Sequence, residues 1–203
     1  MYALVEDNNI TQYINNPKSL VIGDVRYPAK IFQLWSKSEL NAIGIYEIVN
    51  DLTNYKDNEY YINTNEQYNF ADNQVTKSWG TATARRLNDE NAVDDNGDPI
   101  LDQDGVQLIN YGLKTEKKRI VKDQASGLLA PTDWYIVKST EVADYNVPDN
   151  ILSFRADVRS KSNEMETQID ACTTVDELKA LYEYTEQEDG TQTRPLAEFP
   201  KEI

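Results

Sequence analysis

The chain has 203 residues, with 20 basic and 35 acidic side chains, a formal net charge of −15, no histidine and one cysteine. Without histidine it lacks the usual general acid or base near neutral pH, the Ser-His and Cys-His nucleophile pairs and every imidazole metal ligand. One cysteine cannot form an internal disulfide or a cysteine-rich zinc site. We therefore expect a non-enzymatic protein without a cofactor. The acidic balance also disfavours nucleic acid as a partner, because binding it requires Lys and Arg to neutralise phosphates.

No apolar run reaches the roughly 18 residues that a transmembrane helix needs. The N-terminal residues 1–7 also lack the basic region and apolar core of a secretory signal. We expect no membrane insertion.

Residues 1–80 form the first predicted module, a small strand-rich α+β unit. Strand-like segments at 2–6 and 10–14 flank a turn, and Gly23-Asp24 separates the two arms of a second hairpin. Ser36-Lys37-Ser38-Glu39 matches a capping box, which predicts a short helix at this point. Further strand-like segments follow at 45–49, 59–62, 67–70 and 74–77.

Residues 81–112 are predicted to be an acidic linker or a protruding hairpin between two modules. Seven acids and no Lys or Arg lie within 89–106, together with two turn signals, Asn96-Gly97-Asp98-Pro99 and Asp102-Gln103-Asp104-Gly105. Neither turn completes a calcium loop of the EF type, because Ala92 and Ile100 occupy the first ligand position in the two registers. A solvated acidic loop is therefore favoured over an ion site.

Residues 113–203 are predicted to be a helical hairpin module with an extended tail. A basic helix over 114–125 is expected to stop at Gly127, and Pro148 is expected to open a longer helix. The apolar stripe of that longer helix recurs every three or four residues. It comprises Ile151, Phe154, Val158, Ser162, Met165, Ile169 and Cys172. Thr174-Val175-Asp176-Glu177 is a second capping box.

The basic run could meet phosphate, but Glu116 and Asp123 interrupt it. A solvated helix face, or pairing with the preceding acidic segment, is the favoured interpretation. Its members are Lys114, Lys117, Lys118, Arg119 and Lys122.

Aromatic residues offer one further possibility, since Tyr60, Tyr61, Tyr68 and Trp79 could stack on sugar rings. Alternating Tyr on strands more often packs a sheet face. The sequence contains no glycine-rich nucleotide motif and no Gly-x-Ser-x-Gly, so nucleotide-binding and serine-hydrolase functions have no support.

The C-terminal half carries a recognisable pattern. It reads Gly127-Leu128-Leu129-Ala130-Pro131-Thr132-Asp133-Trp134-Tyr135-Ile136-Val137, then Val147-Pro148, Phe154-Arg155-Ala156-Asp157-Val158-Arg159 and Asn163-Glu164-Met165-Glu166. This pattern resembles the C-terminal region of tailed-bacteriophage tail fibre assembly and virion structural proteins. The segments 16–28, 35–40 and 44–46 more loosely resemble the start of virion proteins of marine phages.

The chemistry of this motif indicates a structural role. Pro131 prevents the preceding helix from continuing, Thr132 or Asp133 is expected to cap freed N–H groups, and Trp134 is expected to be a buried apolar anchor between two helices. Arg155 and Arg159 lie one turn apart and are expected to meet carboxylates such as Glu164 or Glu166. The predicted structural or interface anchors are Leu128, Leu129, Pro131, Asp133, Trp134, Arg155 and Arg159.

The resemblance implies a structural component of the phage tail or tail fibre, made in the host bacterial cytoplasm and located in the virion. Its partners would be other tail or fibre proteins, with homo-oligomers possible, and no residue would be catalytic. Two alternatives stay open. One is a tail fibre assembly chaperone absent from the mature particle, and the other is a carbohydrate-binding host-recognition module that uses the Tyr-rich sheet.

Overall fold

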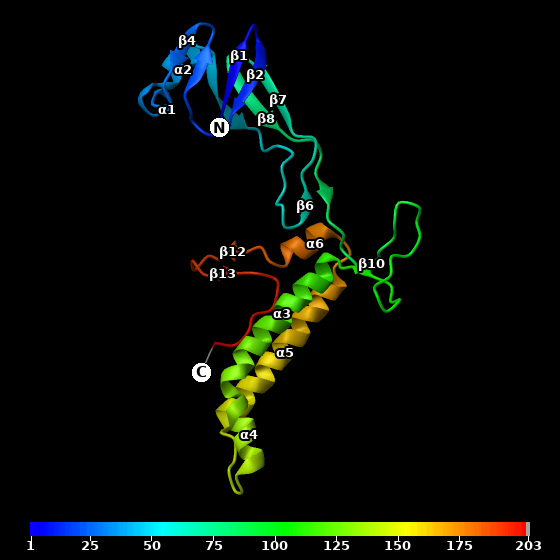
Figure 1. The fold of residues 1–203 in the computed structure, drawn as a ribbon. Helices are drawn as coiled ribbons and strands as arrows, with labels where there is room; N and C mark the ends of the chain where they lie inside the picture. Colours follow the sequence, from blue (N-terminus) through cyan, green and yellow to red (C-terminus); the bar gives the residue numbers. More distant parts are fainter. Residues whose placement is uncertain (202–203) are drawn as a thin grey trace. The chain divides into compact units, whose positions relative to one another are not determined.

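The computed structural model describes residues 1–201, and it divides the chain into two compact units, residues 1–84 and 85–203. The expected α+β class is confirmed: the N-terminal unit is rich in strands, and the C-terminal unit is built on packed helices (Figure 1). Residues 81–84 belong to the first unit, and residues 85–112 belong to the second.

A curved five-stranded sheet organises the first unit. Its order is β2-β1-β5-β8-β7, in which β5 and β8 are parallel and the other neighbours are antiparallel. The strands are β1 Tyr2–Glu6, β2 Asn9–Ile14, β5 Ile45–Asn50, β7 Gln67–Ala71 and β8 Gln74–Ser78. The outer strands β2 and β7 approach each other, since the ring centroids of Tyr13 and Tyr68 are 4.7 Å apart.

Both faces of this sheet carry apolar side chains, because successive strand residues point to opposite sides. One face packs Leu4, Ile14 and Ile45 against Phe32 and Leu40 of the short helices α1 Ile31–Leu34 and α2 Lys37–Ala42. The other face packs Ala3, Val5 and Val75. The predicted capping box of α2 is confirmed, with the Ser36 hydroxyl accepting from the Glu39 N–H and the Glu39 carboxylate accepting from the Ser36 N–H.

Gly44 is required where α2 turns into β5. Its φ is +83°, and a Cβ atom at this position would lie 2.6 Å from the Val5 carbonyl oxygen. The Gly44 carbonyl accepts a hydrogen bond of 2.8 Å from the Val5 N–H, so this close approach ties α2 to the sheet.

Two small strand pairs complete the first unit. The strands β3 Leu20–Ile22 and β4 Val25–Tyr27 form the predicted hairpin around Gly23, and β6 Tyr61–Ile62 pairs with β9 Thr83–Ala84.

The second unit begins with a loop closed by the two-residue strands β10 Glu90–Asn91 and β11 Ile109–Asn110. Two long helices follow, α3 Leu113–Leu129 and α5 Asp149–Ala171, which lie side by side (Figure 1). They are joined by the 3-10 turn η1 Ala130–Thr132 and by α4 Asp133–Glu141. The unit ends with α6 Val175–Ala180 and with the hairpin of β12 Thr185–Glu186 and β13 Gln192–Thr193.

The long helix α5 buries the predicted stripe. Pro148 precedes its first residue, as expected, and the seven stripe positions from Ile151 to Cys172 are all buried. Part of this core packs Phe154 and Val158 against Ala125 of α3. The Thr174–Glu177 capping box at the start of α6 is also confirmed.

One predicted helix end and the predicted extended conformation of the C-terminal tail are wrong. Gly127 does not stop the basic helix, because α3 continues to Leu129; a helical glycine costs only about 1 kcal/mol relative to alanine. The tail after Glu186 is not simply extended, because the turn at Gly190 folds β12 onto β13 and Leu196 is buried. None of the helices within residues 1–201 is long and apolar enough to span a membrane.

Candidate functional site

The predicted anchor residues meet at the end of the helical hairpin where α3 leads into α4. Pro131 lies in η1, which begins directly after Leu129, the last residue of α3, so its predicted helix-ending role is confirmed. Proline lacks the N–H that an α-helical hydrogen bond would need. Leu128 and Leu129 pack against the cluster of Ala125, Phe154 and Val158, and they fix the end of α3 to α5.

Arg155 holds this junction together from the neighbouring helix α5. Its Nη1 atom donates to the Leu129 carbonyl at 3.1 Å and to the Thr132 hydroxyl at 2.6 Å, and it lies 2.8 Å from Asp133 Oδ1. The Arg155 side chain is 8% exposed, whereas Asp133 is 60% exposed. The guanidinium therefore contacts acceptors at the end of α3, in η1 and at the start of α4, of which the Thr132 hydroxyl is buried and the Asp133 carboxylate is mostly exposed.

The predicted carboxylate partners of the two arginines are wrong. Glu164 pairs with Lys161 at 2.7 Å and Glu166 with Lys122 at 3.1 Å, whereas Arg159 donates to the Arg155 carbonyl at 3.3 Å. Helical side chains meet at spacings of three or four residues, and both glutamates lie farther along α5 than that from either arginine.

The predicted capping role of Thr132 and Asp133 is also wrong. No side chain caps the start of α4, and the Thr132 hydroxyl donates to the Leu129 carbonyl at 2.7 Å. The backbone stays helical through η1, so the Asp133 N–H already donates to the carbonyl of Ala130. The Thr132 hydroxyl can therefore accept a hydrogen bond from Arg155, and the Asp133 carboxylate can pair with the same guanidinium.

Trp134 is not the buried anchor that the sequence suggested. It is 51% exposed, and its ring lies 4.0 Å from that of Tyr135, with the Lys138 ammonium 5.5 Å from its centroid. No residue of the short helix α4 is fully buried, although six of its nine side chains are uncharged and four of those form the apolar run Trp-Tyr-Ile-Val. Part of the apolar surface of α4 therefore faces solvent, whereas Tyr135 and Ile136 are partly buried.

Val137 belongs to this surface but is not among the predicted anchor residues. It is exposed on the same helix one turn after Trp134. The signal was present in the continuous apolar run Trp134-Tyr135-Ile136-Val137, which has no alternation to indicate a buried face.

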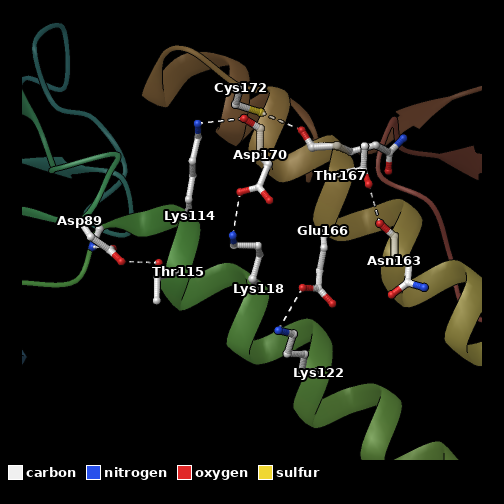
Figure 2. A network of polar contacts seen from close by, with 12 residues as sticks. Asp89, Lys114, Thr115, Lys118, Lys122, Asn163, Glu166, Thr167, Asp170 and Cys172 are labelled. Atoms are coloured by element: carbon white, nitrogen blue, oxygen red, sulfur yellow. Dashed lines mark hydrogen bonds and ion pairs between the residues drawn. The ribbon is translucent and has the colours of Figure 1, made fainter.

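The basic face of α3 is paired with acids of α5, as Figure 2 shows. Lys118 Nζ lies 2.7 Å from Asp170 Oδ1, Lys122 Nζ lies 3.1 Å from Glu166 Oε2, and Lys114 donates to the Asp170 carbonyl at 3.0 Å. Of the preceding acidic segment, Asp89 accepts from the Thr115 hydroxyl and the Gly112 N–H rather than from a lysine. These lysines therefore align two helices.

The acidic segment folds into two similar turns. Asp94 Oδ1 accepts the N–H groups of Asn96 and Asp98 at 2.9 Å, and Asp102 Oδ1 accepts those of Asp104 and Val106. The hydrogen bonds from the Asp98 and Asn96 backbone hold the pKa of Asp94 below its usual value. Across the described part of the chain, no group of three or more acidic or cysteine side chains is placed to hold a metal ion.

Half of the proposed sugar-stacking set is unsuitable for that role. Tyr60 and Tyr61 are buried, because they pack into the first unit and so have no free ring face. Tyr68 and Trp79 are partly exposed, but the Lys77 ammonium lies 5.5 Å and 4.8 Å from their ring centroids.

Comparison with known proteins adds no relative from which a function could be carried over: no family model, curated protein or solved structure matches the chain.

Proposed function

We propose that this chain is a non-enzymatic structural protein of a tailed-bacteriophage virion, a tail or tail-fibre component that acts through protein–protein contacts. In this proposal it is made in the host bacterial cytoplasm and resides in the tail of the particle. The similarity of residues 127–166 to tail fibre assembly and virion structural proteins is the starting point.

The observation that carries the proposal is the exposed apolar surface of α4 on a rigid support. Trp134 and Val137 are both 51% exposed, and no residue of α4 is fully buried. Exposed apolar surface of this kind is typical of interaction sites, and Trp is among the residues that most often dominate binding energy. The Arg155 hydrogen bonds hold the start of α4 in place, so little conformational entropy is lost when a partner docks.

Mass spectrometry of purified particles tests the location. A tail component is expected at constant stoichiometry to the other tail proteins after particles are separated from lysate. Absence of the chain from mature particles, together with its presence in infected cells, would replace this proposal by the assembly chaperone.

The variant Trp134→Ala tests the surface. Because the side chain is half exposed, we expect its removal to change the free energy of unfolding by less than about 1 kcal/mol. Loss of a Trp at an interface is expected to weaken partner binding by about 30-fold or more. The readout is the amount of variant incorporated into purified virions.

Tyr184→Ala is the matched control, because it removes an aromatic side chain that is similarly exposed, at 52%, outside the hairpin end. Incorporation of Trp134→Ala at the level of Tyr184→Ala and the parent chain would contradict the assignment of α4 as the contact surface.

A further inference from the structure

The acidic loop between β10 and β11 is an ordered surface. We define the acidic lobe as residues 92–108. Three backbone hydrogen bonds close a ring through it: Ala92 N–H to Leu108 C=O at 2.8 Å, Ile100 N–H to Ala92 C=O at 3.0 Å, and Leu108 N–H to Ile100 C=O at 2.9 Å. The Gln107 amide nitrogen donates to the same three carbonyls. These bonds, with the two aspartate turns, give the lobe a defined shape before any partner binds.

The acidic lobe presents both apolar and negative groups to solvent. Its exposed apolar side chains are Val93, Ile100, Leu101, Val106 and Leu108. Ile109 and Tyr111 extend this surface toward α3 and are also exposed. Five exposed carboxylates of the lobe form no ion pair with any residue in the described ranges: Asp94, Asp95, Asp98, Asp102 and Asp104.

One segment of the first unit carries the opposite charge beside exposed apolar groups. We define the basic patch as the exposed residues of 18–37, which include the β3–β4 hairpin and α1. This segment contains one acid, Asp24, and four cations: Lys18, Arg26, Lys30 and Lys37. All four cations are exposed and have no ion-pair partner between Met1 and Lys201.

Apolar side chains also lie among these cations. Val21 and Arg26 are paired across the β3–β4 hairpin, and Val21, Val25 and Leu34 are exposed, Leu34 at 75%. A surface with exposed aliphatic groups among unpaired cations complements a lobe with exposed aliphatic groups among unpaired carboxylates.

We propose that the acidic lobe of one molecule binds the basic patch of a second copy of this chain. Two lobes would repel each other, because each carries only negative charge, and the net charge of −15 makes nonspecific association unfavourable. The basic patch of a second copy, in contrast, offers the acidic lobe both complementary charge and apolar contact. The contact joins different surfaces of two copies, so it is heterologous, and repeated use generates a ring if the rotation closes or a filament if it does not.

Sedimentation velocity of the full chain tests this contact over a range of protein concentrations. At about 0.05 M NaCl we expect species larger than the monomer whose fraction rises with concentration, and at about 0.5 M NaCl we expect dissociation, because salt screens exposed charges. A monomer at every concentration and both salt levels would overturn the proposal, and it is also the result expected if lobe and patch bind within one molecule.

Charge reversal on each side provides the specific test. The lobe variant Asp95→Lys/Asp98→Lys/Asp104→Lys spares Asp94 and Asp102, whose carboxylates hold the turns. The patch variant is Arg26→Glu/Lys30→Glu/Lys37→Glu. We expect each variant alone to associate roughly 10- to 100-fold more weakly than the parent chain. An equimolar mixture is expected to regain association, because each variant then offers a surface complementary to the other.

A matched control separates local charge from net charge. Asp123→Lys/Glu141→Lys/Asp157→Lys changes the net charge by the same amount as the lobe variant and alters exposed positions on α3, α4 and α5. It is expected to associate as the parent chain does. Circular dichroism verifies that each variant is folded, and a mixture of folded lobe and patch variants that stays monomeric would refute the contact.

Discussion

At the scale of single residues, Arg155 connects the end of α3, η1 and the start of α4 at the candidate site. Its guanidinium is buried and donates to a backbone carbonyl and a hydroxyl, while the carboxylate it pairs with is mostly exposed. Leaving a buried acceptor without its donor lowers the free energy of unfolding by more than an exposed ion pair raises it. The neutral contacts of Arg155 should therefore matter more for stability than its charge partner.

We predict that Arg155→Ala lowers the free energy of unfolding by about 2–3 kcal/mol. The buried Thr132 hydroxyl loses its donor, the Leu129 carbonyl keeps only the bond from Thr132, and the aliphatic stem of Arg155 no longer packs. The companion variant Asp133→Asn should cost less than about 1 kcal/mol, since Asp133 is 60% exposed. Urea unfolding followed by circular dichroism measures both. Equal losses for the two variants would show that the ion pair, rather than the buried hydrogen bonds, holds the junction.

The sequence indicated that Arg155 belongs to the site, but it did not indicate which groups the guanidinium meets. Arg155 is separated in sequence from Leu129 by 26 positions and from Thr132 by 23. Its hydrogen bonds to them therefore depend on how α3 and α5 pack. The exposure of Trp134 is hidden from the sequence for the same reason: an aromatic residue beside proline fits a buried or an exposed position equally well.

At the scale of elements, two short helices depend on their capping boxes. Glu177 accepts hydrogen bonds from the Thr173 N–H, the Thr173 hydroxyl and the Thr174 N–H at the start of α6, and these lower its pKa. Hydrogen bonds from the Ser36 hydroxyl and N–H likewise lower the pKa of Glu39 at the start of α2. A lowered pKa means that the folded state binds its proton less readily than the unfolded state does.

We predict that the unfolding temperature falls as pH is lowered from about 6 to about 3, because stability from these carboxylates is present above their ordinary pKa and is lost as pH falls through the lowered values. The double variant Glu39→Gln/Glu177→Gln should show a shallower fall, measured by thermal melts at each pH. Asp157→Asn, which removes an exposed carboxylate in the middle of α5, is the control and should follow the parent curve. A double variant with the parent's full pH dependence would contradict the capping account.

At the scale of the whole molecule, each unit has a core of its own. The sheet clusters around Leu4 and Val75 lie in the first unit, and the cluster around Val158 lies in the second. Segments with their own apolar cores generally fold independently. The acidic lobe lies in the second unit and the basic patch in the first, so the two surfaces of the proposed contact belong to different folding units.

We predict that residues 1–84 and 85–203, produced as separate fragments, each give a cooperative unfolding transition. Their far-UV circular dichroism spectra, weighted by length, should sum to that of the full chain, with the helical signal in the second fragment. An unfolded fragment on either side would show that the two units depend on each other for stability.

Features that depend on neighbours along the chain were predictable from the sequence. The α+β class, the capping boxes at Ser36 and Thr174, the helix break at Pro131 and the buried stripe of α5 all follow from local hydrogen-bonding chemistry and apolar spacing. The hydrogen bond between Arg155 and Thr132, the ion pair between Lys118 and Asp170 and the exposure of Trp134 were not predictable in this way. These depend on distances between residues that are remote in sequence, and periodicity along a helix does not specify which neighbouring element its side chains will reach.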